Sequence, residues 1–478
     1  MSLQLNRPVS ERARGVPAAI PGTRAAGVPN RRRLVQLAVL LFLALLVEGI
    51  ARKWVFPGVH QYLYFLRDPF LLGFYIVALR VIPMAGWFAL WLGAACFISL
   101  MSLLVFMLDD ISPVLWILGV RNYFMYIPLA FIVARIFERD DIERFARLLA
   151  VLAVPIAFVC VKQFLSPPGG WINVGAGGAP PPMFADGLLR TTGILASDAQ
   201  HIDYVVFTLS LFAAVLISAK LPTRGRFVLI VGAIATITMM IVSGSRGVWF
   251  QAIGIGIVAA CSFFLARAGI GTKLRGIMTP LMSALLISAL FSTVFAGAYK
   301  AYENRNLTAN TFSYNTTERI IGLFLPNSMF EASVAGTGIG LGTTGASAAV
   351  TGERAFNIEG DLDRNFVELG LFSGWIFVAL RWTFALWLVW IGFRAARMGD
   401  ATALLLSCFA ALAIFQSQIT MHTVYAHLTW FAAGLTMAAA RFAPASARVA
   451  GTGWMPPRRG MVRWRASFDP QVPGAPRL

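Results

Sequence analysis

Apolar runs long enough to cross a lipid bilayer recur along this chain. A helix of roughly 20 apolar residues spans the hydrocarbon core, because its backbone satisfies its own hydrogen bonds there. Hydrophobic residues make up 58% of the 478 residues and charged residues only 13%. The pattern predicts an all-α, polytopic membrane helical bundle with about 12 transmembrane helices. We expect these helices at residues 35–50, 65–80, 87–107, 114–136, 147–165, 202–219, 227–243, 248–266, 277–297, 366–391, 402–419 and 424–440.

The distribution of positive charge predicts how the bundle is oriented. The formal net charge of +18 arises mostly from the two tails and from short connections between apolar runs. Because Lys and Arg concentrate in cytoplasmic loops, both termini are predicted to be cytoplasmic. Such a distribution is typical of membrane topology and of contact with anionic membrane lipid, and it argues against a nucleic-acid partner.

Two segments on the opposite, outer face are too long to be simple turns. Residues 166–201 are rich in Gly and Pro, which predicts an ordered loop or lid. Residues 298–365 form a larger loop between the ninth and tenth predicted helices. The chain is therefore expected to divide into a disordered basic tail, helices 1 to 9, the large outer loop, helices 10 to 12 and a second basic tail, at residues 1–34, 35–297, 298–365, 366–440 and 441–478.

The sequence predicts neither a cofactor nor a metal. A GxGxxG match at 340–345 lies in the outer loop, whereas a dinucleotide site requires this motif between a strand and a helix. The four cysteines fall inside predicted spans without a CxxC spacing, and the four histidines form no HExxH pattern. We expect the glycines of 336–345 to allow backbone to approach a ligand or lipid headgroups closely.

Positive side chains gather where the predicted topology places the outer face. Arg246 lies in the turn SGSRGVW (243–249) between two apolar runs, beside Gly and Ser that expose backbone N–H groups to an anion. A charge within a span is costly and usually faces the bundle interior or a wet cavity. Internal ion pairing, of Arg67 with Asp68 or Asp110 for example, is the structural alternative for any one residue. Together these cations predict a diphosphate-binding site made by Arg246, Arg190, Arg121, Arg67 and Arg52.

Acidic residues concentrate just before the tenth predicted helix and at its start, where Glu368 lies. Asp361, Asp363 and Glu368 are the candidate catalytic residues, because a carboxylate near a bound diphosphate can act as general base toward a sugar hydroxyl. The alternative is that an exported loop containing these residues is simply solvated and acidic. His422 is a further candidate base.

Several of these segments together resemble the O-antigen ligase and polymerase superfamily of bacterial envelope polysaccharide assembly. They are SGSRGVW at 243–249, RTTG at 190–193, the Gly-rich 336–345 and NFVELGLFSG at 365–374, while EGIARKW at 48–54 and RDP at 67–69 look like a subgroup of exopolysaccharide polymerase-like proteins. The resemblance implies metal-independent transfer of sugar from undecaprenyl diphosphate at the periplasmic face of the bacterial inner membrane. By position, Arg246 would bind the diphosphate and Arg190 would line the same cavity.

The sequence departs from the ligase pattern at one point. Ligases of this superfamily place a His-Asn pair shortly before the tenth helix, whereas here Arg364 precedes Asn365 and no histidine lies within 298–391. A repeat-unit polymerase or a diverged ligase therefore fits better than a typical ligase. Its expected partners are the undecaprenyl-diphosphate-linked oligosaccharide donor and acceptor, and a chain-length regulator.

Two other functions are compatible with the same pattern. A 12-helix transporter or flippase would move a lipid-linked saccharide or another anion, and a structural scaffold would have no substrate. The sequence shows no internal repeat that divides the predicted helices into two related halves, and its largest outer loop is placed asymmetrically. These features favour the enzyme.

Overall fold

The structure is a computed structural model that describes residues 28–109, 112–181, 189–219, 221–265, 326, 328–342 and 360–450. Helices and short turns account for its regular structure, and these ranges contain no strand. The elements are α1 (Arg31–Ile50), the π-helical η2 (Ala51–Val55), the 3-10 turn η3 (Pro57–Val59), α2 (His60–Leu63), α3 (Arg67–Leu79), α4 (Trp87–Leu108), α5 (Pro113–Phe124), α6 (Ile127–Ile136), α7 (Arg139–Leu165), the 3-10 turns η4 (Trp171–Asn173) and η5 (Ala176–Gly178), α8 (Asp198–Ser218), α9 (Thr223–Val242), α10 (Arg246–Leu265), α14 (Ser328–Glu331), α16 (Asp361–Arg397), α17 (Thr402–Gln416) and α18 (Thr423–Ala450).

Eight helical segments of the described ranges are long and apolar enough to cross a membrane. They are Arg31–Val55, Pro57–Leu79, Trp87–Leu108, Pro113–Ile136, Arg139–Leu165, Asp198–Ser218, Thr223–Val242 and Asp361–Arg397. Large apolar side chains such as Leu90, Phe158 and Ile234 face outward, as expected for a surface solvated by lipid. The prediction of an all-α protein is therefore confirmed, and these eight segments are candidates to span a membrane.

The four remaining predicted spans are not among these eight segments. The spans at 248–266 and 402–419 correspond to shorter apolar helices, Arg246–Ser262 and Thr402–Gln416. The last predicted span, 424–440, lies within α18. The span at 277–297, most of the loop 298–365, and most of both tails lie outside the described residues.

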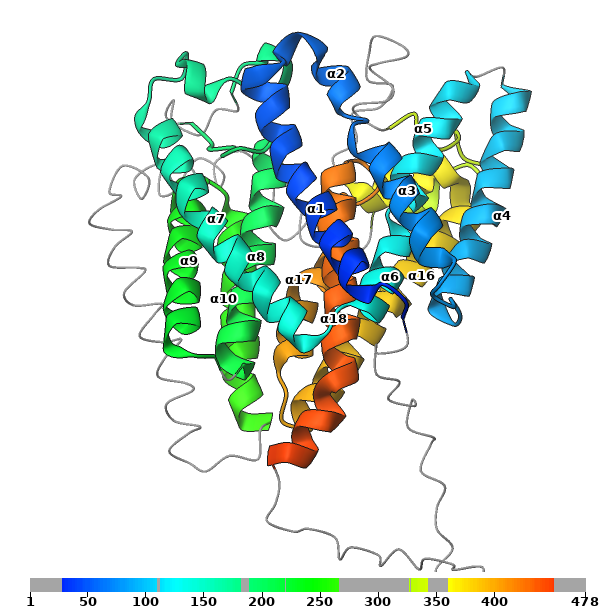
Figure 1. The fold of residues 1–478 in the computed structure, drawn as a ribbon. Helices are drawn as coiled ribbons and strands as arrows, with labels where there is room; N and C mark the ends of the chain where they lie inside the picture. The colour runs from blue at the N-terminus through cyan, green and yellow to red at the C-terminus, as the bar shows by residue number, and fades with distance from the viewer. Residues whose placement is uncertain are drawn as a thin grey trace, which may run out of the picture.

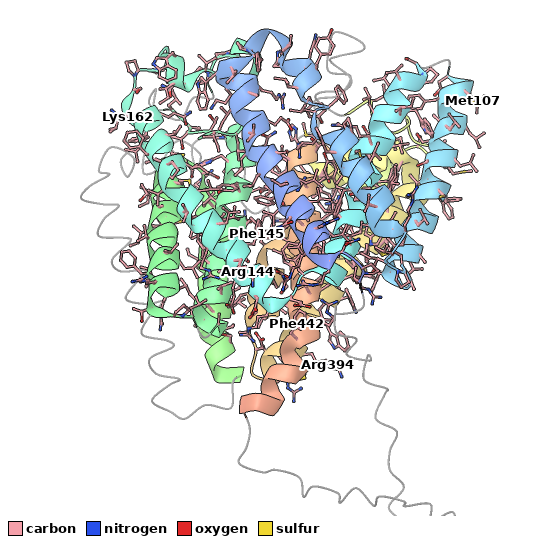
Figure 2. All side chains as sticks on the ribbon, viewed as in Figure 1. Met107, Arg144, Phe145, Lys162, Arg394 and Phe442 are labelled. Carbon is pink, nitrogen blue, oxygen red and sulfur yellow. The ribbon has the colours of Figure 1, made fainter. Side chains whose placement is uncertain are left out.

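The first and last described helices meet at one end of the bundle, which we call the terminal end (lower in Figure 1). There Arg31 of α1 donates to the Ile136 carbonyl and Arg441 of α18 to the Phe137 carbonyl, each at 2.8 Å. Figure 2 places Arg394 toward this end too. Cations at the terminal end thus bind the carbonyls where α6 stops. We call the opposite end, where α1 ends and α10 begins, the site end.

Aromatic packing at the centre joins four helices that are distant in the sequence. The ring of Phe42 in α1 lies 5.0 Å from Phe145 in α7, 5.4 Å from Phe207 in α8 and 5.2 Å from Phe431 in α18. Edge-to-face and tilted contacts at such separations stabilise a core beyond simple burial. This layer fixes the relative height of α1, α8 and α18.

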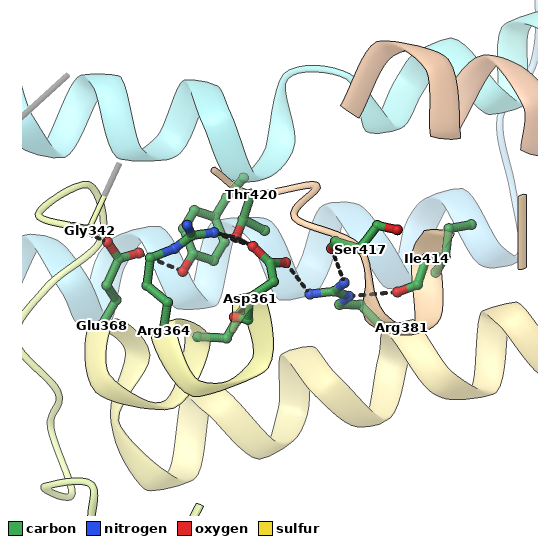
Figure 3. Close-up of polar contacts among 10 residues, drawn as sticks. Gly342, Asp361, Arg364, Glu368, Arg381, Ile414, Ser417 and Thr420 are labelled. Atoms are coloured by element: carbon green, nitrogen blue, oxygen red, sulfur yellow. Dashed lines mark hydrogen bonds and ion pairs between the residues drawn. The ribbon is translucent and has the colours of Figure 1, made fainter. Parts of the chain in front are cut away.

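Helix α16 reverses direction at Gly370. A straight helix would separate Asp361 from Arg381 by about 30 Å, yet Asp361 Oδ2 lies 2.7 Å from Arg381 Nη1. Gly370 has φ 74° and ψ 177°, which breaks the helix into the halves 361–369 and 371–397. The first half folds back along the second (Figure 3). The prediction of one continuous helix over 366–391 was therefore wrong at its start, because the reversal falls inside an apolar run.

The Gly-rich segment 333–342 caps the broken helix. Thr337 N donates to the Val367 carbonyl and Gly338 N to the Glu368 carbonyl, each at 2.9 Å, so carbonyls left without helical partners are satisfied. A Cβ added at Gly336 would collide with backbone at Gly370. These glycines therefore bring two backbone segments together, whereas the sequence predicted a close approach to a ligand or to lipid headgroups.

We predict that Gly370→Ala destabilises the fold. An alanine at this φ and ψ is strained by about 1–3 kcal/mol, and its Cβ would collide with the backbone of 334–336. Thermal unfolding of the detergent-purified protein measures the loss. Gly254→Ala, in regular helix with open space around it, is the control and should leave the melting temperature nearly unchanged. Equal behaviour of the two variants would contradict the reversal.

Candidate functional site

Two arginines at the site end share one buried carboxylate. Arg67 Nε donates to Glu48 Oε2, and Arg52 Nη1 donates to Glu48 Oε1 at 3.2 Å. Arg67 is 1% exposed and also donates to Thr423 Oγ1 at 3.1 Å. A buried charge is tolerated only when it is paired and hydrogen-bonded, so Glu48 anchors both guanidinium groups.

A third arginine joins them through an aromatic ring. Arg121 Nε donates to Asp68 Oδ2 at 2.5 Å, and Nη2 donates to Asp68 Oδ1 at 3.1 Å. The Tyr64 ring centroid lies 4.5 Å from the Arg121 guanidinium carbon and 5.3 Å from that of Arg52. The Tyr64 ring is thus shared by the guanidinium groups of Arg52 and Arg121. Through this ring and Glu48, the predicted arginines of η2, α3 and α5 are linked to each other.

Lys53 completes this group, and its partners are uncharged. Its ammonium donates to Thr192 Oγ1 at 2.6 Å and to the Gly193 carbonyl at 2.8 Å, and the side chain is 1% exposed. Gln163 holds the same loop from the other side, accepting from Gly193 N at 2.8 Å and donating to its carbonyl at 3.0 Å. The loop 190–193 is therefore fixed by polar contacts from two helices.

We call Arg52, Lys53, Arg67 and Arg121, with Glu48 and Asp68, the cationic cluster. With all groups ionised, four cations face two carboxylates, which leaves an excess of two positive charges among these described residues. An unbalanced charge in a membrane-embedded interior is unfavourable unless a counter-ion or water reaches it. The cluster therefore has the electrostatic character of an anion site.

Arg190 and Arg246 lie beside the loop that Lys53 contacts. Arg190 Nη1 is 3.1 Å from Asp198 Oδ2, and its side chain is 25% exposed. Thr191 Oγ1 donates to the Val242 carbonyl at 3.1 Å, which ties the loop to the turn before α10. Arg246 is the first residue of α10 and is half-buried. All five arginines predicted to bind diphosphate thus lie at the site end.

The arginines do form internal ion pairs, which was the structural alternative, but with other partners than those expected. Arg67 pairs with Glu48 rather than with Asp68, and Asp68 pairs with Arg121, whereas Asp110 lies outside the described residues. The sequence analysis missed Glu48. Its spacing of four residues from Arg52 was the signal that could have identified it.

The candidate carboxylate Asp361 is completely engaged. It accepts hydrogen bonds from Arg364, from Arg381 at 2.7 Å and from Thr420 at 2.9 Å (Figure 3). Arg381 also donates to the Ile414 carbonyl at 2.8 Å. These bonds hold the two halves of α16 against α17, so Asp361 has a structural role. Arg381, to which the sequence analysis assigned no role, is part of the same network.

Glu368 is engaged in the same way. The Tyr123 hydroxyl donates to its Oε2 at 2.6 Å, and the Gly342 N–H donates to its Oε1 at 2.5 Å. Glu368 is buried, as are Asp361, Arg364 and Arg381. These two carboxylates and two arginines form a charge-balanced group that we call the α16 cluster. Its charges need no further ligand.

Asp363 differs from the other two carboxylates because it is only half-buried. Its Oδ1 accepts from Ser328 Oγ at 2.7 Å and from Ser328 N at 3.2 Å. No contact of Oδ2 with a donor occurs among the described residues. Of the three candidate catalytic residues, Asp363 is the one that is not fully buried.

The cationic cluster and the α16 cluster contact the same short turn. Thr420, between α17 and α18, bonds Arg364 at 2.5 Å, and Thr423, the first residue of α18, bonds Arg67 at 3.1 Å. On α5, Arg121 belongs to the cationic cluster and Tyr123 donates to Glu368. The fold thus brings Arg67 and Arg121 to the elements that also contact Asp361 and Glu368, although these residues are distant in the sequence.

The described residues contain no group of three or more His, Cys, Asp and Glu side chains placed to hold a metal ion. No protein-family model matches this chain, and the curated proteins give no match either. The chemistry of the site is therefore argued from its own residues.

We predict that Glu48→Gln strongly destabilises the protein, since it leaves Arg52 and Arg67 without a counter-charge. The expected loss is about 3–5 kcal/mol, visible as a lower melting temperature in detergent. Glu331→Gln, an exposed carboxylate on α14, is the control and should have little effect. Arg67→Met in the Glu48→Gln background should recover part of the loss, because it removes the orphaned charge. If the two substitutions lower the melting temperature additively, that result would argue against the ion pair between Glu48 and Arg67.

Proposed function

We propose that this protein is a membrane-embedded glycosyltransferase that polymerises undecaprenyl-diphosphate-linked oligosaccharide repeat units at the periplasmic face of the bacterial inner membrane. The observation that carries the proposal is the excess positive charge of the cationic cluster. A diphosphate that links a sugar to a lipid carries one negative charge on each phosphate. Its two negative charges would therefore neutralise the two positive charges of the cationic cluster that Glu48 and Asp68 do not balance.

Burial divides the cations into two roles. Arg52, Arg190 and Arg246 are partly exposed and would contact the diphosphate oxygens directly. Arginine suits this task, because its planar fork matches phosphate geometry. Arg67, Arg121 and Lys53 are buried and would not contact the diphosphate directly. They would stabilise it through the electrostatic field of their positive charges. A lipid-linked substrate supplies its own activated sugar, so no nucleotide is required.

The reaction would proceed by attack of an acceptor hydroxyl on the anomeric carbon of the donor sugar. The bond from that carbon to the diphosphate oxygen breaks as the new glycosidic bond forms, and the diphosphate leaves with its electron pair. Fixed guanidinium groups stabilise the charge that develops on the leaving oxygen. The hydroxyl proton passes to a carboxylate. Asp363 is best suited for this step, whereas Asp361 and Glu368 hold the reversed helix in place.

The first test concerns binding of the diphosphate. Arg246→Ala is expected to weaken binding of a polyprenyl-diphosphate oligosaccharide by about tenfold or more, because a charge-assisted hydrogen bond is lost. Binding and glycan growth are measured with the full chain in nanodiscs. Arg394→Ala removes the same charge toward the terminal end and should change neither quantity. Translocation of the lipid without glycan growth would instead favour a flippase, and unchanged binding by Arg246→Ala would contradict the proposed site.

The second test concerns the general base. Asp363→Asn is expected to lower kcat by about 100- to 10,000-fold, while donor binding stays close to that of the unmodified protein. Release of polyprenyl diphosphate and glycan length are the measurements. Glu331→Gln is the matched control for loss of one carboxylate charge in the same part of the chain. Full activity of Asp363→Asn would exclude it as the base.

A further inference from the structure

Asp203 is a buried carboxylate without an ion-pair partner among the described residues. The buried acidic residues of the described ranges are Glu48, Asp141, Asp203, Asp361, Glu368 and Asp400. Each of the other five forms an ion pair or accepts a hydrogen bond. Asp203 is 6% exposed, and its Oδ2 has no hydrogen-bond partner. A carboxylate in this state is costly inside a membrane protein and indicates a functional site.

The position of Asp203 follows from contacts deeper in the bundle. Ser210 Oγ donates to the Leu405 carbonyl at 2.6 Å, and the Phe207 ring lies 5.7 Å from that of Phe409. These contacts place one face of α8 against α17. Asp203 lies one turn from Phe207 on the same face, toward the site end. It therefore faces the last turns of α17.

Two glutamines at the same level add unpartnered oxygens. Gln200 lies about two turns from Phe207, and Gln416 lies about two turns from Phe409, both toward the site end. Because α8 and α17 run in opposite directions, the two glutamines are level with each other. The Oε1 atom of each is buried and has no hydrogen-bond partner.

Helix α18 closes the third side. Phe207 and Phe431 both pack on Phe42, so they lie at a similar height. Tyr425 of α18 lies within electrostatic range of Asp203, and Thr429 follows one turn later on the same face. Thr429 is 0% exposed, and its Oγ1 has no partner. We call the side-chain oxygens of Gln200, Asp203, Gln416 and Thr429 the oxygen pocket.

We propose that the oxygen pocket binds a monovalent alkali cation. Carboxylate, amide and hydroxyl oxygens are hard ligands, and they suit alkali and alkaline-earth ions rather than transition metals. With Asp203 ionised, the pocket contributes a single negative charge from the described residues, which one monovalent ion neutralises. No Arg or Lys of those residues pairs with Asp203, in contrast to Glu48 and Asp361. The cation site is independent of the proposed glycosyltransferase activity.

The test uses the full chain in nanodiscs, equilibrated in choline chloride. NaCl or KCl then replaces choline chloride at constant ionic strength, and the melting temperature is followed together with equilibrium binding of radioactive Na⁺ and Rb⁺. One of the two ions should raise the melting temperature saturably, by about 5 °C at full occupancy. Asp203→Asn should abolish this rise. Thr208→Val is the control and should keep it, because the Thr208 hydroxyl is satisfied within its own helix.

A second pair of variants covers a failure of Asp203→Asn to fold. Thr429→Val and Gln416→Leu each remove one oxygen, and each should raise the ion concentration at half-saturation by about tenfold or more. Identical melting curves of the unmodified protein in sodium, potassium and choline chloride would overturn the proposal. A salt response that survives in all three pocket variants would overturn it as well. Neither result affects diphosphate binding at Arg246.

Discussion

Burial of charge in a lipid environment is the constraint on which this structure depends. An ion moved from water into a medium of low dielectric loses its hydration, and only an opposite charge or dense hydrogen bonding offsets that loss. Glu48 and Asp361 meet the constraint in the same way, since each single carboxylate contacts two arginines. The first links α1 to α3, and the second links the two halves of α16. These ion pairs therefore determine helix arrangement as well as local electrostatics.

The reversal at Gly370 determines where the carboxylates at the start of α16 lie. Without it, the segment around Asp361 would continue the line of α16 and lie about 30 Å from Arg381. Folded back, it reaches the turn between α17 and α18, where Thr420 contacts one charged cluster and Thr423 the other. A helix end inside a bundle requires partners for its carbonyls, and the Gly-rich segment provides them. Gly336 and Gly370 are both needed because two backbones meet there.

The sequence predicted the helical class, most helix positions and the gathering of arginines at one end. These features follow from the apolar content of the spans and from the placement of charge, which are local properties. The partner of Arg67 was not predictable, because Glu48 and Asp68 sit in separate helical segments and either one could face Arg67. The reversal was missed for a related reason. Gly370 lies in an apolar run, and only its φ of 74° distinguishes it from a glycine tolerated in a helix.

The α16 cluster, the cationic cluster and the oxygen pocket differ more clearly in net charge than in residue composition. The α16 cluster combines two arginines with two carboxylates and is neutral, and both carboxylates accept hydrogen bonds from within the protein, so it serves structure. The cationic cluster retains a positive excess and is reached through the partly exposed Arg52, which suits an anion. The proposed oxygen pocket carries a negative charge when Asp203 is ionised, and each of its four residues offers an oxygen without a hydrogen-bond partner among the described residues, which suits a cation. A residue of one type thus takes different roles, because its role depends on which charges and hydrogen-bonding atoms its neighbours leave without a partner.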